Sequence, residues 1–503
     1  MTRLEGGQFR FLTLPVPLWL AAGAVLTFLF VYSQTLAWTS DESFHLLAAL
    51  SVNAGHTPYL DFFYQHPPLY VYLTAAWMRL FGETWRSVHV MSALLTMAGI
   101  VLVADFLFSR LPHDSWRLGA TGAAMLLAGL ERQTLKVGVV AQQYGLCIFL
   151  LALAFRLAIA SVDRRRGFLP VWAGVCAGAA AASNLLVAPA APILLIWLLH
   201  ESEPDTRRRQ SVRYLAGTVI PFIPLLWLFA RASRHVYFNV VEYHLRYRRE
   251  ENLDAGWTTF KIDANTLTSW TDASQPVLLI SLAALGLAFI TGPDWPRRTR
   301  SEFLLCLWLA AGLALVAAGA HPTFPAYFVT TLPFLGVLAG VGLYAVASRI
   351  WAPRRGHAVF LALAFLYVMT PLKMIVPLKA LYRDPSSLEW TWRYYEALAK
   401  KVQELTPKDS RVYATRQHFF VASRRPFLPG RESYHVGKLP AHRAESLGYG
   451  SEDRLRQHVL AGHFATIVIW PDEDKRLFEE LMSTDLYARR EGWGEAQIFW
   501  DKR

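Results

Sequence analysis

Carboxylate and imidazole side chains occur together shortly after the first apolar run of the sequence. Asp41 and Glu42 follow Ser40, and His45 comes one helical turn later. Ser40 is a suitable N-cap for a helix from Asp41 to about Ala54, and the dipole of that helix keeps carboxylates in its first turn ionised. An ionised carboxylate there can accept a proton from an attacking hydroxyl. Simple helix capping is the alternative, and the local sequence leaves both interpretations open.

A second polar group follows in the same stretch and could hold an anion. Tyr59 and Asp61 precede His66, which is followed by two prolines. The prolines impose an extended approach and allow a helix to start at Pro68 and run to about Phe81. The free N–H groups at the start of a helix attract anions such as phosphate. The alternative is an interfacial helix with a stiff start, in which tyrosines only form an aromatic belt.

Three further places carry charge next to apolar runs. Arg86 opens the run after this stretch, and Glu131 and Arg132 form a short polar connection. The connection could contribute to a cavity. Alternatively, its side chains simply extend from a helix end toward the membrane surface. The basic and aromatic stretch 243–249 could hold sugar or phosphate, or contact lipid headgroups. No His, Asp or Glu spacing demands a metal site, and a divalent cation near Glu42 and His66 is left open.

The elements that must position these residues are membrane-spanning helices. The chain has 503 residues, of which 54% are hydrophobic and only 17% charged, too few charges to cover soluble domains. A spanning helix needs about 20 mainly apolar residues. We predict about eleven spans, at 11–33, 87–108, 118–130, 137–160, 167–187, 188–200, 214–230, 273–293, 303–320, 324–348 and 358–378. The long run 167–199 is divided at Pro189 and Pro192.

Arginine clusters set the orientation of these spans. The clusters at 164–166, 207–209 and 297–300 fall on one side, and the positive-inside rule makes that side cytoplasmic, together with the N-terminus. The net charge of +12 therefore follows membrane topology and does not indicate a nucleic-acid partner. The first outer loop then covers residues 34–86, and a long outer connection of about 40 residues covers 231–272. The sequence has no P-loop, so an ATP-driven pump is disfavoured.

Polarity rises abruptly after residue 380. We predict a membrane domain at 1–380 and a small soluble α/β domain at 381–503 on the outer side. Its expected elements are a helix at 389–405, strands at 411–415 and 465–470, a helix at 472–482 and a last strand at 496–500.

The order of these motifs resembles one known family. An acidic pair, a histidine, Asp61, then His-Pro-Pro-Leu and an arginine before the next span are similar to the polytopic GT-C glycosyltransferases of the protein O-mannosyltransferase and aminoarabinose-transferase type. Aminoarabinose transferases tend to have lysine before the two prolines, where this chain has His66. The resemblance covers about residues 38–100, with looser agreement in the layout of the spans.

This resemblance implies an inverting transferase that moves a hexosyl or pentosyl group from a polyprenyl-phosphate carrier to a lipid, polysaccharide or protein of the cell envelope. It implies a multi-pass protein of the bacterial inner membrane. Asp41 would be the base, and Glu42 would orient it or the acceptor. His66 and Arg86 would lie near the donor phosphate, and the remaining candidates for substrate binding in the same loop are Tyr59, Asp61 and His45.

Two other classes of protein are left open. A transporter or flippase of lipid-linked sugars would share the spans and an outer anion site, although transporters usually place ionisable residues near the middle of the membrane. A scaffold whose outer domain binds a partner would make the acidic pair dispensable.

Overall fold

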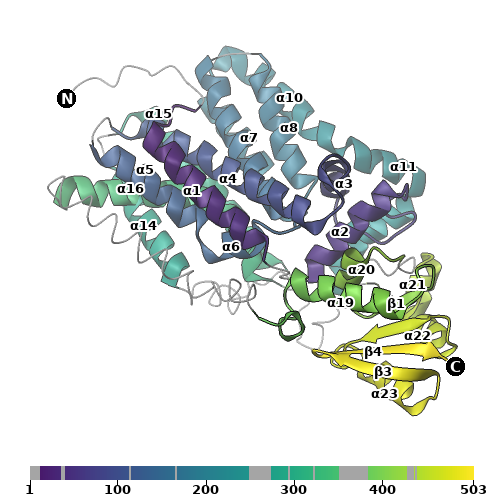
Figure 1. The fold of residues 1–503 in the computed structure, drawn as a ribbon. Helices are drawn as coiled ribbons and strands as arrows, with labels where there is room; N and C mark the ends of the chain where they lie inside the picture. Colours follow the sequence, from purple (N-terminus) through teal and green to yellow (C-terminus); the bar gives the residue numbers. More distant parts are fainter. Residues whose placement is uncertain are drawn as a thin grey trace.

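The structure of the chain is a computed structural model that describes residues 12–35, 40–112, 115–164, 167–248, 274–292, 295–320, 323–350, 383–426, 436 and 439–503 (Figure 1). The predicted span 358–378 and most of the predicted connection 231–272 lie outside these residues.

Long apolar helices form the body of the protein. Six helical stretches within the described residues are long and apolar enough to cross a membrane: Val16–Ser33, Trp85–Arg110, Tyr144–Asp163, Pro204–Tyr247, Arg297–Gly319 and Pro325–Arg349. Three shorter apolar helices cover Leu169–Ala181, Leu185–Glu201 and Gln275–Ile290. The protein is therefore a multi-pass membrane protein, and the predicted number of eleven spans stays a prediction.

The helices of this body are α1 (Val16–Ser33), α4 (Trp85–Arg110), α5 (Ser115–Gly129), α6 (Arg132–Val137), α7 (Tyr144–Arg164), α8 (Leu169–Ala181), α9 (Ala190–Glu201), α10 (Pro204–Val219), α11 (Ile223–Tyr237), α14 (Ser274–Ile290), α15 (Arg297–Gly319) and α16 (Leu332–Ile350). Short 3₁₀ turns η1 (Leu185–Val187), η2 (Ile220–Phe222) and η5 (Pro325–Thr331) and a π-helix η3 (Phe238–Tyr247) join them.

Two predicted boundaries differ from the structure. The span predicted at 214–230 is part of a longer helical stretch, Pro204–Tyr247, which has a kink at Ala232. The residues from 233 to 247 are therefore helical rather than the start of a connection. Arginines 207–209 therefore lie on a helix, in its first turns. The division of the run 167–199 is confirmed, because α8 ends at Ala181 and α9 begins at Ala190.

Glycines let pairs of these helices touch at the backbone. A Cβ atom on Gly174 of α8 would lie 2.0 Å from the carbonyl oxygen of Tyr214 in α10. One on Gly342 of α16 would lie 2.0 Å from the carbonyl oxygen of Leu282 in α14. Such close packing of small residues is a common way for helices to associate in a membrane.

Buried ionic contacts fix α4 against its neighbours. Asp105 accepts hydrogen bonds from Nη2 of Arg156 in α7, at 2.5 Å, and from the backbone N–H of Thr13, at 2.6 Å. Nε of Arg110 contacts Oε2 of Glu302 in α15 at 2.6 Å. These contacts hold the C-terminal end of α4, whose first residues are Trp85 and Arg86.

The C-terminal residues form helices around a four-stranded sheet. The helices are η7 (Pro385–Ser387), α19 (Trp392–Leu405), α20 (Gln417–Ser423), α21 (Ala441–Ser446), α22 (Glu452–Leu460) and α23 (Lys475–Ser483). The strands β1 (Val412–Ala414), β2 (Thr466–Ile469), β3 (Tyr487–Trp493) and β4 (Ala496–Lys502) are ordered β1-β2-β4-β3. β1 and β2 are parallel, with Tyr413 opposite Ile467, and β4 is antiparallel to both β2 and β3. The elements predicted for this region form at the predicted places, and β3, α20, α21 and α22 were not predicted.

Two helices of the first loop, α2 (Ser40–Asn53) and α3 (Leu69–Phe81), match the predicted helices closely. Figure 1 shows α2 beside α19 and α20, between the helical body and the sheet. Phe44 of α2, Tyr70 of α3 and Trp392 of α19 share one buried hydrophobic cluster. The rings of Trp85 and Trp392 stack at 5.2 Å. The C-terminal region therefore shares a core with the first loop, and the boundary at residue 381 stays a prediction.

Candidate functional site

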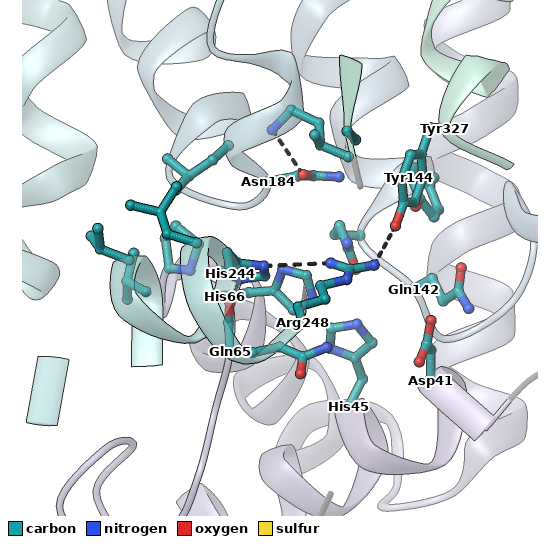
Figure 2. Close-up of a pocket in the computed structure, with 18 residues that line it drawn as sticks. Asp41, His45, Gln65, His66, Gln142, Tyr144, Asn184, His244, Arg248 and Tyr327 are labelled. Atoms are coloured by element: carbon teal, nitrogen blue, oxygen red, sulfur yellow. Dashed lines mark hydrogen bonds between the residues drawn. The ribbon is translucent and has the colours of Figure 1, made fainter. Parts of the chain in front are cut away.

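A cavity of about 360 Å³ lies beside the first turn of α2 (Figure 2). Its walls come from α2, the segment before α3, the start of α7, η1, η3 and η5. The described polar residues that line it are Asp41, His45, Gln65, His66, Gln142, Gln143, Tyr144, Asn184, His244, Arg248 and Tyr327. Ligand sites typically have volumes of about 300 to 1,000 Å³, so this cavity is large enough for a small ligand.

The segment before α3 is held by an unusual turn. Tyr59 has a positive φ of 69° and is fully buried, and its hydroxyl donates to the carbonyl oxygen of His66 at 2.7 Å. The backbone N–H of Tyr64 donates to Oδ1 of Asn239 in η3 at 3.0 Å. Asn239 in turn donates to the hydroxyl of Tyr449 in the C-terminal region at 3.0 Å. His66 is therefore placed in the cavity wall by contacts from two distant parts of the chain.

A cationic group occupies another wall. Arg248 directly follows the π-helix η3, and its Nη2 donates to the hydroxyl of Tyr327. Its Nη1 lies 3.4 Å from Nδ1 of His244, whose Nε2 lies 2.6 Å from the carbonyl oxygen of Gln65. A carbonyl only accepts, so Nε2 carries the hydrogen and Nδ1 is left to accept from the guanidinium. This chain of contacts fixes Arg248 next to the segment that carries His66.

Asp41 contributes the carboxylate of the cavity. It is partly buried in the first turn of α2, and it is the one acidic residue among the described lining residues. The cationic Arg248 and three histidines line the same space. The cavity thus combines one potential proton acceptor with a basic surface.

His45 follows Asp41 by one turn of α2 and is almost fully buried. Its side chain is 2% exposed, stacks on His66 at 5.4 Å and has its Nδ1 3.1 Å from the hydroxyl of Tyr64. Burial lowers the pKa of His45 to about 4, and the Asp41 carboxylate, a hydrogen bond with Gln143 and the Glu42 carboxylate offset this only in part. His45 is therefore neutral at neutral pH.

The buried neutral state of His45 predicts a loss of stability in acid. A histidine in the unfolded chain takes up its proton near pH 6.5, whereas His45 in the fold resists it until about pH 4. Since the unfolded state binds more protons between these values, stability falls as the pH drops from 6.5 to 4, by about 3 kcal/mol from this group. Thermal unfolding of the purified protein at pH 7, 6, 5 and 4, compared with His45→Phe, measures this contribution. An equal fall in the His45→Phe protein would contradict it.

Glu42 points away from the cavity, although it neighbours Asp41. It is fully buried, and its Oε1 contacts Nε2 of His89 in α4. The same oxygen accepts from Nε1 of Trp392 in α19 at 3.2 Å. Nδ1 of His89 lies 2.5 Å from the carbonyl oxygen of Ser33 at the end of α1. Glu42 thus joins α2 to α1, α4 and the C-terminal region. From this position it can hold α2, the helix that carries Asp41, in a fixed orientation.

The other residues predicted for the site do not line the cavity. Arg86 is 48% exposed and pairs with Glu396 of α19 at 3.1 Å. Asp61 is exposed and accepts from the backbone N–H of Thr57 at 2.6 Å.

Glu131 and Arg132 also lie outside the lining. Glu131 is buried and caps α6, accepting from the backbone N–H of Gln133 at 2.5 Å. Arg132 is exposed, and its backbone N–H donates to Gln275. The structure brings Asp41, His45 and His66 together, and the roles predicted for all these residues stay predictions.

Several lining residues were not singled out from the sequence. Gln142, Gln143 and Asn184 interrupt apolar runs, and a polar group inside a membrane segment is by default a candidate for function. Arg248 lies in the stretch 243–249, for which the sequence leaves sugar, phosphate or lipid headgroups open as ligands. Its position in the cavity depends on the π-helix η3, which forms in a segment that the sequence predicts to be a connection.

Within the part of the chain that the structure describes, no group of three or more His, Cys, Asp or Glu side chains is arranged to hold a metal ion. Asp41 is the one acidic residue that lines the cavity together with its three histidines. Glu42 contacts His89 and does not line the cavity. A divalent cation near Glu42 and His66 stays an untested expectation.

Comparison with known proteins agrees with this architecture. Residues 65–228 match the family model of dolichyl-phosphate-mannose-protein mannosyltransferase. The structure resembles ArnT from Cupriavidus metallidurans bound to undecaprenyl phosphate, with a TM-score of 0.68, 16% identity and coverage of 96% of this chain and 98% of that one. The apo state of the same ArnT gives a TM-score of 0.62 with 15% identity, covering 95% of this chain and 97% of that one.

A more distant likeness connects the chain to the oligosaccharyltransferase of Archaeoglobus fulgidus, with a TM-score of 0.51, 14% identity and coverage of 89% of this chain and 69% of that one. No curated protein matches the chain in sequence. The fold is that of the GT-C membrane glycosyltransferases, as the first-loop motifs predicted.

Proposed function

We propose that the protein is an inverting glycosyltransferase that moves a sugar from a polyprenyl-phosphate carrier to an acceptor hydroxyl of the cell envelope. The observation that carries the proposal is the cavity that contains both Asp41 and Arg248 (Figure 2). A carboxylate can accept the acceptor's proton, and a guanidinium can hold the donor's phosphate. The likeness to a protein crystallised with undecaprenyl phosphate supports this class of donor.

The reaction follows from the placement of these two groups. The acceptor oxygen attacks the anomeric carbon from the face opposite the phosphate, and its proton passes to the Asp41 carboxylate. The bond between the anomeric carbon and the phosphate oxygen breaks, and its electron pair leaves with the lipid phosphate. Charge then develops on the phosphate, where Arg248 stabilises it. Attack from the opposite face inverts the anomeric centre.

The remaining groups of the cavity position the substrates. His66 and His244 lie beside Arg248 on the wall that would receive the phosphate. Glu42 acts through α2 and orients Asp41. The protein lies in the bacterial inner membrane with its N-terminus in the cytoplasm, so the cavity opens to the outer face, where polyprenyl-linked sugars and envelope acceptors meet.

A transporter of lipid-linked sugars is the alternative that the sequence left open. The matched family model and the archaeal neighbour are both named for transfer of a sugar to another molecule. Transporters usually place ionisable residues near the middle of the membrane, whereas Asp41 lies in the predicted outer loop. These points favour the enzyme.

Mass spectrometry of the cell envelope tests the proposal. Lipids and polysaccharides from cells without the gene should lack one glycosyl group, and expression of the wild-type protein should restore it. Purified protein in nanodiscs, given a polyprenyl-phosphate sugar and extract from the deleted cells, should release polyprenyl phosphate. An unchanged envelope together with no release of polyprenyl phosphate would contradict the proposal.

A further inference from the structure

We propose that Asn239 and Tyr449 are positioning residues that hold two walls of the cavity at a fixed distance, so that a segment of the C-terminal region aligns the proposed phosphate site. One wall is the segment that carries His66, and the other is η3 with Arg248 directly after it. Asn239 and Tyr449 lie outside the cavity lining. The inference rests on the proposed function, because it concerns the alignment of the groups that would bind the phosphate.

The side-chain amide of Asn239 joins three segments of the chain. It is fully buried in η3, and its Oδ1 accepts from the backbone N–H of Tyr64 at 3.0 Å. Its Nδ2 donates to the carbonyl oxygen of His235 in α11 at 2.8 Å and to the hydroxyl of Tyr449 at 3.0 Å. An amide presents a donor and an acceptor in one plane. One side chain therefore ties the first loop, the start of η3 and the C-terminal region together.

The hydroxyl of Tyr449 completes a closed set of hydrogen bonds. It accepts from Asn239 and donates to the carbonyl oxygen of Tyr59 at 3.3 Å. Tyr59 has a positive φ, which is unfavourable for a residue other than glycine, so its surroundings must hold it in this conformation. The hydroxyl of Tyr59 in turn donates to the carbonyl oxygen of His66 at 2.7 Å. Tyr449 thus supports the turn that places His66 in the cavity wall.

Ring packing and an ion pair reinforce this connection. The ring of Phe63 contacts those of Tyr449 and Tyr243 edge to face, with centroids 5.7 Å and 5.1 Å apart, in one buried cluster. Nη2 of Arg443 in α21 donates to Oε2 of Glu242 in η3 at 2.6 Å. The C-terminal segment therefore contacts both walls at once, and a change in its position changes the space between them.

The spacing of the walls decides whether their donors can bind one phosphate. The rings of His66 and His244 lie 6.1 Å apart, and Nη1 of Arg248 lies 3.4 Å from Nδ1 of His244 (Figure 2). Donors on both walls bind the same anion only when each lies within hydrogen-bonding distance of its oxygens. A displacement of about 1 Å is enough to lose such contacts. Loss of the connecting hydroxyl should therefore weaken phosphate binding without removing a group that touches the phosphate.

Tyr449→Phe removes the connecting hydroxyl and keeps the ring. Full-length protein in nanodiscs is loaded with a fluorescent polyprenyl phosphate, which unlabelled polyprenyl phosphate displaces. We expect Tyr449→Phe to bind this lipid about three- to tenfold more weakly than wild type, as the loss of one aligning hydrogen bond predicts. Thermal unfolding is measured on the same samples.

Tyr394→Phe is the matched control. Tyr394 is buried like Tyr449, and its hydroxyl donates to the carbonyl oxygen of Trp493 at 2.9 Å, within the C-terminal region. The control loses a hydrogen bond of the same kind, so it should lose a similar amount of thermal stability. It should bind polyprenyl phosphate with wild-type affinity, because its hydroxyl contacts neither wall of the cavity.

A double-mutant cycle separates alignment from a purely structural role. If Tyr449 acts by aligning the two walls, its effect on lipid binding requires Arg248. In the Arg248→Ala protein, Tyr449→Phe should therefore change the affinity for polyprenyl phosphate by less than about twofold. A purely structural effect would be equally large with and without Arg248.

Arg443→Ala tests the same connection at a less buried position. It removes the ion pair with Glu242 and should weaken lipid binding about threefold. Tyr449→Phe decides the question if it folds, and Arg443→Ala decides it if Tyr449→Phe does not fold.

The outcomes distinguish this inference from the proposed function. If wild-type protein does not bind polyprenyl phosphate, the proposed function fails and the inference fails with it. If wild-type protein binds the lipid and the deciding variant binds it equally well, the inference is overturned while the function stands. The same conclusion follows if the deciding variant weakens binding as much in the Arg248→Ala protein as in wild type.

Discussion

Replacing Asp41 by asparagine is expected to lower the rate of sugar transfer by about 10² to 10⁴ while leaving the protein folded and able to bind donor lipid. Asparagine has the same shape as aspartate but cannot accept the acceptor's proton. Asp41 lies in the first turn of α2 and lines the cavity with its side chain partly buried. If the residue only stabilised the start of α2, the same change would cost well under ~1 kcal/mol of stability and leave transfer intact.

Asp61→Asn is the matched control for this experiment. Asp61 carries the same functional group in the same loop, but it is exposed and accepts from the backbone N–H of Thr57, a bond that an asparagine oxygen can also accept. Transfer by purified protein in nanodiscs is measured as release of polyprenyl phosphate, alongside thermal unfolding. Near wild-type transfer by Asp41→Asn would leave Asp41 as a helix-capping residue, and a large loss in Asp61→Asn would move the base to Asp61.

The elements of this fold that could be predicted from the sequence are those with local signals. Ser40 before an acidic pair, and two prolines after His66, gave α2 and α3 to within one or two residues. Apolar runs bounded by arginines gave most of the long helices. Short runs rich in β-branched and aromatic residues gave the strands β1, β2 and β4. In each case the physical cause lies within a few neighbouring residues.

The parts that could not be predicted depend on contacts between distant residues. Nothing near Glu42 in the sequence indicates that it turns to His89 and Trp392 while Asp41 faces the cavity. The same holds for Arg248, whose neighbours suggested a surface stretch and whose partner Tyr327 lies 79 residues further along the chain. Since Asp41 and Glu42 are consecutive residues of one helix, only the packed structure decides which of the two meets the ligand.

Replacing Arg248 by alanine is expected to weaken binding of the donor lipid roughly ten- to hundred-fold, because a charge-assisted hydrogen bond to phosphate contributes ~1.5 to 3 kcal/mol. Arg248→Lys should recover part of this loss, since lysine keeps the charge but lacks the planar fork that matches two phosphate oxygens. The measurement is displacement of fluorescent polyprenyl phosphate from the full-length protein. Polyprenyl phosphate without a sugar is sufficient as the probe, because the proposed contact of Arg248 is with the phosphate group.

Arg86→Ala distinguishes the residue suggested by the family resemblance from the one suggested by the cavity. Arg86 is half exposed, lies over Trp85 and pairs with Glu396, and exposed pairs of this kind typically contribute at most ~1 kcal/mol. If Arg248 holds the phosphate, Arg86→Ala should lower the thermal stability slightly and leave lipid binding within about threefold of wild type. A large loss of binding in Arg86→Ala with none in Arg248→Ala would reverse the assignment. The phosphate would then lie near the first turn of α4, where α19 of the C-terminal region contributes Glu396, and that region would become part of the donor site.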